Sequence, residues 1–174
     1  MKNRYLSSLP TIAALAFGMT LVSGVPTVAS DPVFSCQSNE DSLTTVAMSN
    51  DGLWQPIFHW NRIRENTSAN PQQLCDSVSQ KLNNYLAEGN DLSSVTFEAQ
   101  EQTGLPAICV VNEVKQCSLL LFTLKPAFKP YRFANDTLAS ILDRDLQAST
   151  VKYRDRGVQS TAYKVNFWQL LGWK

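Results

Sequence analysis

The stretch CVVNEVKQC, Cys109 to Cys117, decides the architecture that the sequence predicts. It closes one apolar run, LPAICVV (105–111), and leads into a second, LLLFTL (119–124). Asn112 to Lys115 separate the two runs as a hairpin turn separates two strands. Two opposed residues at a non-hydrogen-bonded site of such a hairpin lie about 4.5 Å apart at Cα, within reach of a disulfide. The stretch therefore predicts an antiparallel hairpin in which Cys109 faces Cys117 and is bonded to it.

The first 29 residues predict a signal peptide. Lys2 and Arg4 give a positive start, and the apolar run from Thr11 to Val22 is short for a membrane span. The small residues TVA that end at Ala29 match what a signal peptidase accepts, so we expect cleavage there. A retained membrane anchor is the alternative. The rest of the chain is expected in the periplasm, the thylakoid lumen or the extracellular space, with membrane association left open.

The cysteines favour structural disulfides. All four lie in the part expected to be exported, and an even number in an oxidising compartment is typical of disulfides (Cys36, Cys75, Cys109 and Cys117). Zinc and a thioredoxin-type redox pair are the alternatives, but the chain has no Cys-x-x-Cys spacing and a single histidine, His59. We therefore expect no metal and no cofactor. With Cys109 joined to Cys117, the remaining pair would tie the first strand to the first helix.

Two blocks of the chain have the same order, three strands and then a helix. In the first block an apolar stripe between a capping Asn70 and a stop at Gly89 predicts the helix. The second helix is expected to start at Asn135 or Asp136 and to bury Leu138, Ile141, Leu142 and Leu146. Strands are expected at 34–37, 43–49, 56–60, 95–98, 105–111 and 117–124. The predicted fold is α+β, an antiparallel sheet of about six strands packed against two helices and stapled by two disulfides.

The C-terminal residues 148–174 form a basic, aromatic extension. They hold five basic residues and one acidic residue, whereas residues 31–147 hold eight basic and fourteen acidic ones. From Thr161 to Phe167 polar and apolar residues alternate well enough for an edge strand, and the last residues could equally form an amphipathic turn. An apolar cluster near the end could complete the core, or it could touch an anionic membrane or a partner. Its members are Phe167, Trp168, Leu170, Leu171 and Trp173.

Six blocks of the chain resemble, in order and spacing, the circadian oscillating protein family of cyanobacteria. They are FSCQ (34–37), TTVAM (44–48), PIFHW (56–60), PQQLCDSVSQKLNNYL (71–86), LPAICVV (105–111) and CSLLLFTLKP (117–126). The resemblance covers a domain at about 34–147 and includes all four cysteines. The family usually has an arginine where this chain has Leu74. The resemblance implies an uncharacterised exported protein of the cyanobacterial envelope, and it implies no biochemical activity.

Little in the sequence predicts catalysis. It contains no Gly-x-Ser-x-Gly elbow, no phosphate-binding glycine loop and no His-Glu-x-x-His motif. A catalytic triad would have to use His59, and a carboxylate pair for glycoside hydrolysis would come from Glu98, Glu101, Asp143 and Asp145. The two aspartates are expected on the solvent face of the second helix, where charges are usually just hydrated.

The expected function is therefore non-enzymatic. An exported protein with an acidic body is not expected to bind nucleic acid. We expect an envelope protein that binds or scaffolds an unidentified partner, with an anionic membrane surface as a further candidate. A hydrolase of unrecognised type is the alternative.

Overall fold

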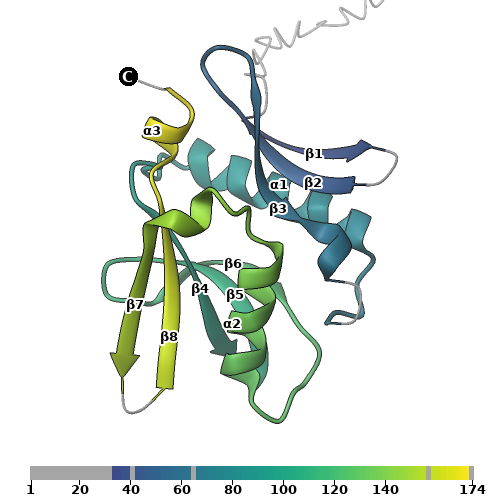
Figure 1. Ribbon diagram of the computed structural model, residues 1–174, viewed down its shortest axis with the longest axis vertical. Coiled ribbons are helices and arrows are strands. Elements are labelled where there is room, and N and C mark those ends of the chain that lie inside the picture. Colours follow the sequence, from purple (N-terminus) through teal and green to yellow (C-terminus); the bar gives the residue numbers. More distant parts are fainter. Residues whose placement is uncertain (1–32, 40–41, 64–65, 156–157, 173–174) are drawn as a thin grey trace, which may run out of the picture. The chain divides into compact units, whose positions relative to one another are not determined.

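The computed structural model describes residues 33–39, 42–63, 66–155 and 158–172. The predicted signal peptide and Trp173 lie outside these ranges. Within them the chain is α+β, and its strands form two antiparallel sheets (Figure 1). The predicted class, the antiparallel pairing and the packing of helices on strands are confirmed. The strands are divided between two sheets, however, and not gathered in one.

The first sheet has the order β1-β2-β3 in the described residues. Its strands are β1 (Phe34–Asn39), β2 (Ser42–Met48) and β3 (Trp54–His59). They are the β-branched and aromatic runs from which the sequence predicts strands. Pro56 lies in β3, which is an edge strand of this sheet in the described residues. An edge strand tolerates proline, which has no backbone N–H to donate to a neighbouring strand.

Helix α1 (Pro71–Ala87) confirms the first predicted helix. The Asn70 side chain accepts a hydrogen bond from Gln72 N at 2.8 Å, and Pro71 takes the first helical position. The helix ends shortly before Gly89, whose φ of 83° is left-handed and costs glycine little. Its buried face consists of Leu74, Cys75, Val78, Ser79 and Leu82. The local capping signals thus set both ends of this element.

The second sheet has the order β6-β5-β4-β8-β7 in the part of the chain that the structure describes. Its strands are β4 (Val95–Gln102), β5 (Leu105–Val111), β6 (Cys117–Thr123), β7 (Thr150–Asp155) and β8 (Val158–Val165). The predicted tail strand is present as β8, but it pairs with β4 on one side and with β7 on the other. It is therefore an inner strand, and β7, which the sequence did not predict, takes the edge.

The β5–β6 hairpin is confirmed, with a correction to its register. Val111, and not Cys109, lies opposite Cys117, because the turn closes where Asn112 N donates to the Gln116 carbonyl at 3.1 Å, and Val111 and Cys117 are the next pair. Cys109 and Cys117 still form the predicted disulfide, with their Cα atoms 5.4 Å apart. Cys36 and Cys75 form the other predicted disulfide, also with a Cα separation of 5.4 Å. The first bond joins two neighbouring strands, and the second ties β1 to α1.

Helix α2 (Pro130–Ile141) begins earlier than predicted, at Pro130 and not at Asn135 or Asp136. The fixed φ of proline suits the first turn of a helix, so Pro130 acts as the start signal. Leu142 leaves the helix with a ψ of 139°, which places Asp143 beyond its end and not on its solvent face. The predicted apolar set is buried as expected: Leu138, Ile141, Leu142 and Leu146.

A chain of aromatic contacts runs through the core and joins the two sheets. Phe34 of β1 meets Phe167 with ring centroids 5.4 Å apart, and Phe167 meets Phe97 of β4 at 6.3 Å. Phe97 in turn meets Phe58 of β3 at 5.0 Å. Phe167 belongs to the short C-terminal helix α3 (Phe167–Leu170), so the end of the chain contributes to this core.

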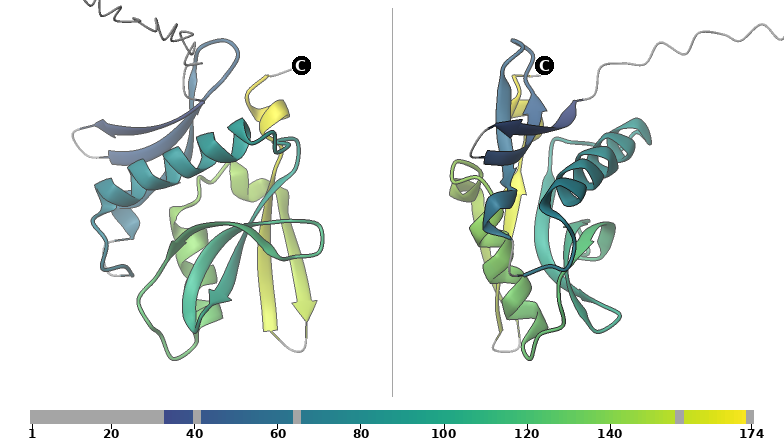
Figure 2. Two further views of the ribbon diagram at one scale, coloured as in Figure 1. Left: turned by 180° about the vertical axis from the view of Figure 1, so that it is seen from behind. Right: turned by 90° about the vertical axis from the view of Figure 1, so that its right-hand side faces the viewer.

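The two long helices pack against different strands. Helix α1 lies against β1, β2 and β6, whereas α2 lies against β4 and β5 (Figure 2). In the ranges described above, no helix is long and apolar enough to cross a membrane.

Candidate functional site

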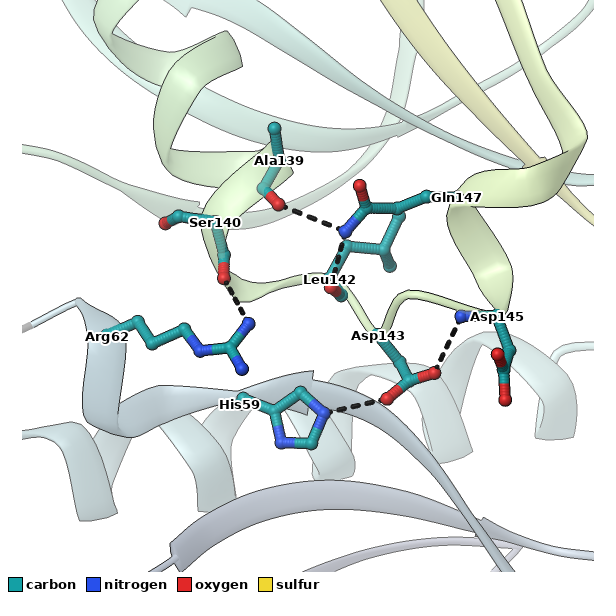
Figure 3. Close-up of polar contacts among 8 residues, drawn as sticks. All are labelled: His59, Arg62, Ala139, Ser140, Leu142, Asp143, Asp145 and Gln147. Carbon is teal, nitrogen blue, oxygen red and sulfur yellow. Dashed lines mark hydrogen bonds and ion pairs between the residues drawn. The ribbon is translucent and has the colours of Figure 1, made fainter.

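The first candidate site is a hydrogen-bonded pair formed by the chain's single histidine and a carboxylate far along the sequence. His59 Nε2 lies 2.8 Å from Asp143 Oδ2, and the two side chains are 29% and 15% exposed (Figure 3). Backbone contacts bring them together, because Asp143 N donates to the Ile57 carbonyl at 2.9 Å and Phe58 forms a β-bridge with Leu142. The sequence predicted both residues as candidates but did not predict that they meet.

The groups around this pair satisfy the C-terminal end of α2. The last carbonyls of a helix have no partner within the helix. Arg62 and Gln147 supply partners here, and Asp143 Oδ1 accepts a hydrogen bond from Asp145 N at 3.0 Å. The capped carbonyls are those of Ser140 (from Arg62, 3.0 Å), Ala139 and Leu142 (from Gln147, 3.1 and 2.8 Å). The cluster in Figure 3 therefore anchors the end of α2 to β3.

In a catalytic triad an aspartate likewise orients a histidine, which then acts as the general base. A nucleophile would have to lie within hydrogen-bond reach of the imidazole. Among the residues that the structure describes, His59 is hydrogen-bonded to Asp143 and to no hydroxyl or thiol. The Ser140 hydroxyl donates to the Thr137 carbonyl at 2.7 Å instead. The arrangement is that of a link between two elements.

The second candidate site is centred on Glu98, in the middle of the second sheet. Its strand neighbours are Cys109 on β5 and Ala162 on β8. The residue is only 5% exposed. Burial raises the pKa of the Glu98 carboxyl, and the charge of Lys115 and the Tyr131 hydroxyl oppose that rise. A carboxyl in such surroundings is easier to protonate than one on the surface.

A cavity of about 450 Å³ lies over this carboxyl, and we call it the Glu98 cavity. Four parts of the chain line it: the end of α1 with the loop to β4, then β4 itself, the β5–β6 turn, and β8. Its size falls within the usual range of small-molecule sites, about 300–1,000 Å³. Residues that matter for its chemistry are Thr96, Glu98, Val111, Lys115, Ala162 and Lys164.

The sequence did not predict the two lysines of this cavity as site residues. Lys164 lies opposite Thr96 in the β4–β8 register, so it shares the sheet face of Glu98. Lys115 adopts a φ of 59° in the β5–β6 turn, a left-handed conformation that is uncommon for a lysine. The available sequence signal was the acidic Glu98 placed directly between two apolar residues, Phe97 and Ala99.

The predicted carboxylates do not come together as one pair. Glu98 and Glu101 are three residues apart in the same strand, so their side chains point to opposite faces of the sheet. Glu101 and Asp145 are exposed, and Asp143 is bonded to His59. Over the described ranges, His, Cys, Asp and Glu side chains do not gather in groups of three or more that could hold a metal ion.

The residues of the predicted tail cluster lie in different surroundings. Phe167 is fully buried and Leu171 is 1% exposed, both within the core. Trp168 is 37% exposed, and its indole N–H donates to Asp91 Oδ1 at 2.9 Å. Leu170 is half-buried. Trp173 is outside the described residues. Surface contact by the described part of the cluster would therefore rest on Trp168 and Leu170.

Comparison with known proteins gives one family. The family model described as "Circadian oscillating protein COP23" matches residues 33–171 of this chain. That range contains all four cysteines, both candidate sites and the strands β7 and β8. Searches of curated proteins and of solved structures found no match.

Proposed function

The chain belongs to the circadian oscillating protein COP23 family, and from this premise we propose that it is an exported, non-enzymatic envelope protein of a cyanobacterium that binds or scaffolds a partner. Its place is the periplasm, the thylakoid lumen or the extracellular side of the envelope. The predicted signal peptide at 1–29 would direct the export. Nucleic acid is not among the partners that we propose.

The observation that carries this proposal is the placement of the two disulfides. All four cysteines are used, in the pairs Cys36–Cys75 and Cys109–Cys117. Cys75 and Cys109 are fully buried, and the bonded cysteines are 39 and 8 residues apart, so neither pair has the Cys-x-x-Cys spacing of a redox site. Buried cross-links of this kind are retained in oxidising compartments and are rare in a reducing cytosol. They support a structural role for the bonds and export of the chain.

The test is to recover the protein from its own cell. Envelope, soluble and cytoplasmic fractions would be alkylated before lysis is complete, so that free thiols are labelled at once. Non-reducing peptide mapping of the envelope or lumenal fraction should find both cystine pairs. Recovery of the protein mainly from the cytoplasm, with labelled thiols at Cys36 or Cys109, would overturn the proposal.

The second candidate function, a hydrolase of unrecognised type, has the His59–Asp143 pair in its favour. That pair is one half of a catalytic arrangement. We place it second because the contacts around Asp143 serve the end of α2, as Figure 3 shows.

Peripheral membrane contact is part of the proposal. Trp168, Leu170 and Trp173 would supply the apolar contact, since indole rings favour the boundary between water and lipid. The basic residues of the C-terminal extension would supply the attraction to anionic lipid, at about 1 kcal/mol per charge near the surface.

A further inference from the structure

The Glu98 cavity owes its space to the residues that flank Glu98 in the sheet. Directly paired residues of adjacent strands have Cβ atoms about 4.5–5.5 Å apart, so a large neighbour would cover the carboxyl. Ala162 has no side chain beyond Cβ, and Cys109 is turned into its bond with Cys117. Glu98 therefore lies on the sheet that forms the floor of this cavity, with no long side chain beside it on β8.

Positive charge stands at a short distance from this floor. Lys164 follows Ala162 by two residues on β8, which corresponds to about 6.6 Å along the same face of the sheet. Lys115 reaches the cavity from the β5–β6 turn, and its charge already acts on the Glu98 carboxyl. The cavity thus presents one buried carboxyl and two ammonium groups to whatever occupies it.

The lining also holds two exposed acidic groups, Asp91 and Glu113. Asp91 Oδ1 accepts hydrogen bonds from Ser93 N at 2.7 Å and from the Trp168 indole at 2.9 Å. Glu113 is exposed in the turn, as are Lys115 and Lys164, so water screens all three charges at the mouth of the cavity. Glu98 is the acidic group that is both buried and at the floor.

We propose that the Glu98 cavity binds a small zwitterion, a free amino acid or a short peptide, whose ammonium contacts Glu98 and whose carboxylate contacts Lys164 and Lys115. Charge-assisted hydrogen bonds of both signs would then orient the ligand. Thr96, Ser94 and Asn112 offer further polar contacts along the wall. This inference rests on the proposed binding role and names the chemistry of one ligand class for it.

The experiment compares matched ligands on the purified, disulfide-bonded protein. Glycylglycine carries both charges, N-acetylglycylglycine lacks the ammonium, and glycylglycine amide lacks the carboxylate. Titration followed by ¹⁵N chemical-shift changes at β4, β8 and the β5–β6 turn should show saturable binding of glycylglycine. Each blocked peptide should bind at least tenfold more weakly. Equal binding of all three peptides, or the absence of saturable binding of glycylglycine at millimolar concentration, would overturn the inference.

Two variants sharpen the comparison. Glu98→Gln removes the floor charge and should weaken glycylglycine binding at least tenfold. Glu101→Gln, an exposed position on the opposite face of the same strand, should leave it unchanged. Unaltered binding in Glu98→Gln would contradict the site. If that variant fails to fold, the blocked peptides on the native chain still decide the matter. Failure of glycylglycine to bind would refute the ligand class but would not affect the proposal of an exported, disulfide-bonded protein. Free cysteines in a cytoplasmic protein would refute the proposal of export but would not decide whether the cavity binds a zwitterion.

Discussion

Asn83 of α1 forms two hydrogen bonds with the backbone of Phe34 in β1, one through its side-chain oxygen and one through its side-chain nitrogen. Its Oδ1 accepts from Phe34 N at 2.9 Å, and its Nδ2 donates to the Phe34 carbonyl at 2.7 Å. The side chain thus makes the two bonds that a neighbouring strand would make at the open side of β1. Because β1 is at the side of its sheet in the described residues, Asn83 closes that edge at one residue.

Replacement of Asn83 by alanine should therefore destabilise the protein. It leaves a half-buried donor and acceptor without partners, and we expect a loss of about 2 kcal/mol in the free energy of unfolding. Asn84→Ala is the matched control, since Asn84 is the next residue of the same helix and is exposed. Urea unfolding would compare the two variants. Equal midpoints would show that the Asn83 bonds contribute little.

The two disulfides should differ in their contribution to stability. The Cys36–Cys75 bond closes a separation of 39 residues, and the Cys109–Cys117 bond closes one of 8. Chain-entropy estimates give about 4 kcal/mol for the larger loop and about 2.5 kcal/mol for the smaller. Double replacement of each pair by alanine, followed by urea unfolding, should reproduce this order. A larger loss from the Cys109–Cys117 pair would indicate that native-state packing, and not loop closure, dominates.

Substitution of the two neighbouring aromatic residues of α3 should have different effects. Loss of Phe167 should lower the stability of the fold, whereas loss of Trp168 should weaken membrane binding. Phe167→Ala removes a fully buried ring that contacts Phe34 and Phe97, so it should cost about 3–5 kcal/mol of stability. Trp168→Ala alters an exposed ring and should change the melting temperature little.

Vesicle sedimentation tests the membrane part of the proposal with the same pair of variants. The native chain should sediment with anionic vesicles at low salt and be released as salt rises. Trp168→Ala should sediment less. A native chain that ignores anionic vesicles at low salt would exclude the membrane contact, whatever the stability of Phe167→Ala.

The His59–Asp143 pair should matter for stability only modestly. A partly exposed ion pair usually contributes about 0–1 kcal/mol, and we expect Asp143→Asn to lie within that range. Asp145→Asn, an exposed neighbour, is the control. The same two proteins, together with His59→Gln, would be tested on a panel of ester, amide and glycoside substrates. If the native chain turned over one of these substrates, and both His59→Gln and Asp143→Asn abolished that turnover, the protein would be a hydrolase.

The elements that the sequence predicted correctly are those set by local chemistry. Asn70, Pro71 and Gly89 mark the ends of α1 by capping and backbone geometry, and these act within a few residues. The β5–β6 hairpin follows from a turn between two apolar runs. Both disulfides followed from these two elements together with an even number of cysteines.

The features that the sequence did not predict depend on contacts between distant segments. In the described residues, β4 has β5 on one side and β8 on the other, so it has no free edge to which the first sheet could add. This arrangement depends on β8, which lies far from β4 in the sequence. The meeting of His59 with Asp143 depends on the bridge between Phe58 and Leu142. The Glu98 cavity depends on Ala162 being the residue beside Glu98, which no periodicity in either strand reveals.

The pH dependence of stability should report the burial of Glu98. Burial raises the pKa of this carboxyl in the folded protein above its value of about 4.5 in the unfolded chain. Between the two pKa values the folded protein holds a proton that the unfolded chain has lost, so stability falls as pH rises through this window. Glu98→Gln removes that dependence. Its stability relative to the native chain should therefore increase as the pH rises from about 4.5 towards neutral, and below the unfolded pKa the difference should no longer change.

Urea unfolding at a series of pH values would measure this difference, with Glu101→Gln as the control. The other titratable groups around the carboxyl remain in both variants, so their contributions largely cancel in the comparison. They are Lys115, Lys164, Asp91, Glu113, Tyr85 and Tyr131. The Glu101→Gln curve should stay parallel to that of the native chain, because Glu101 is exposed on the other face of the strand. A Glu98→Gln curve that is also parallel would mean that the carboxyl titrates normally, and the floor of the cavity would then be as open to water as the surface.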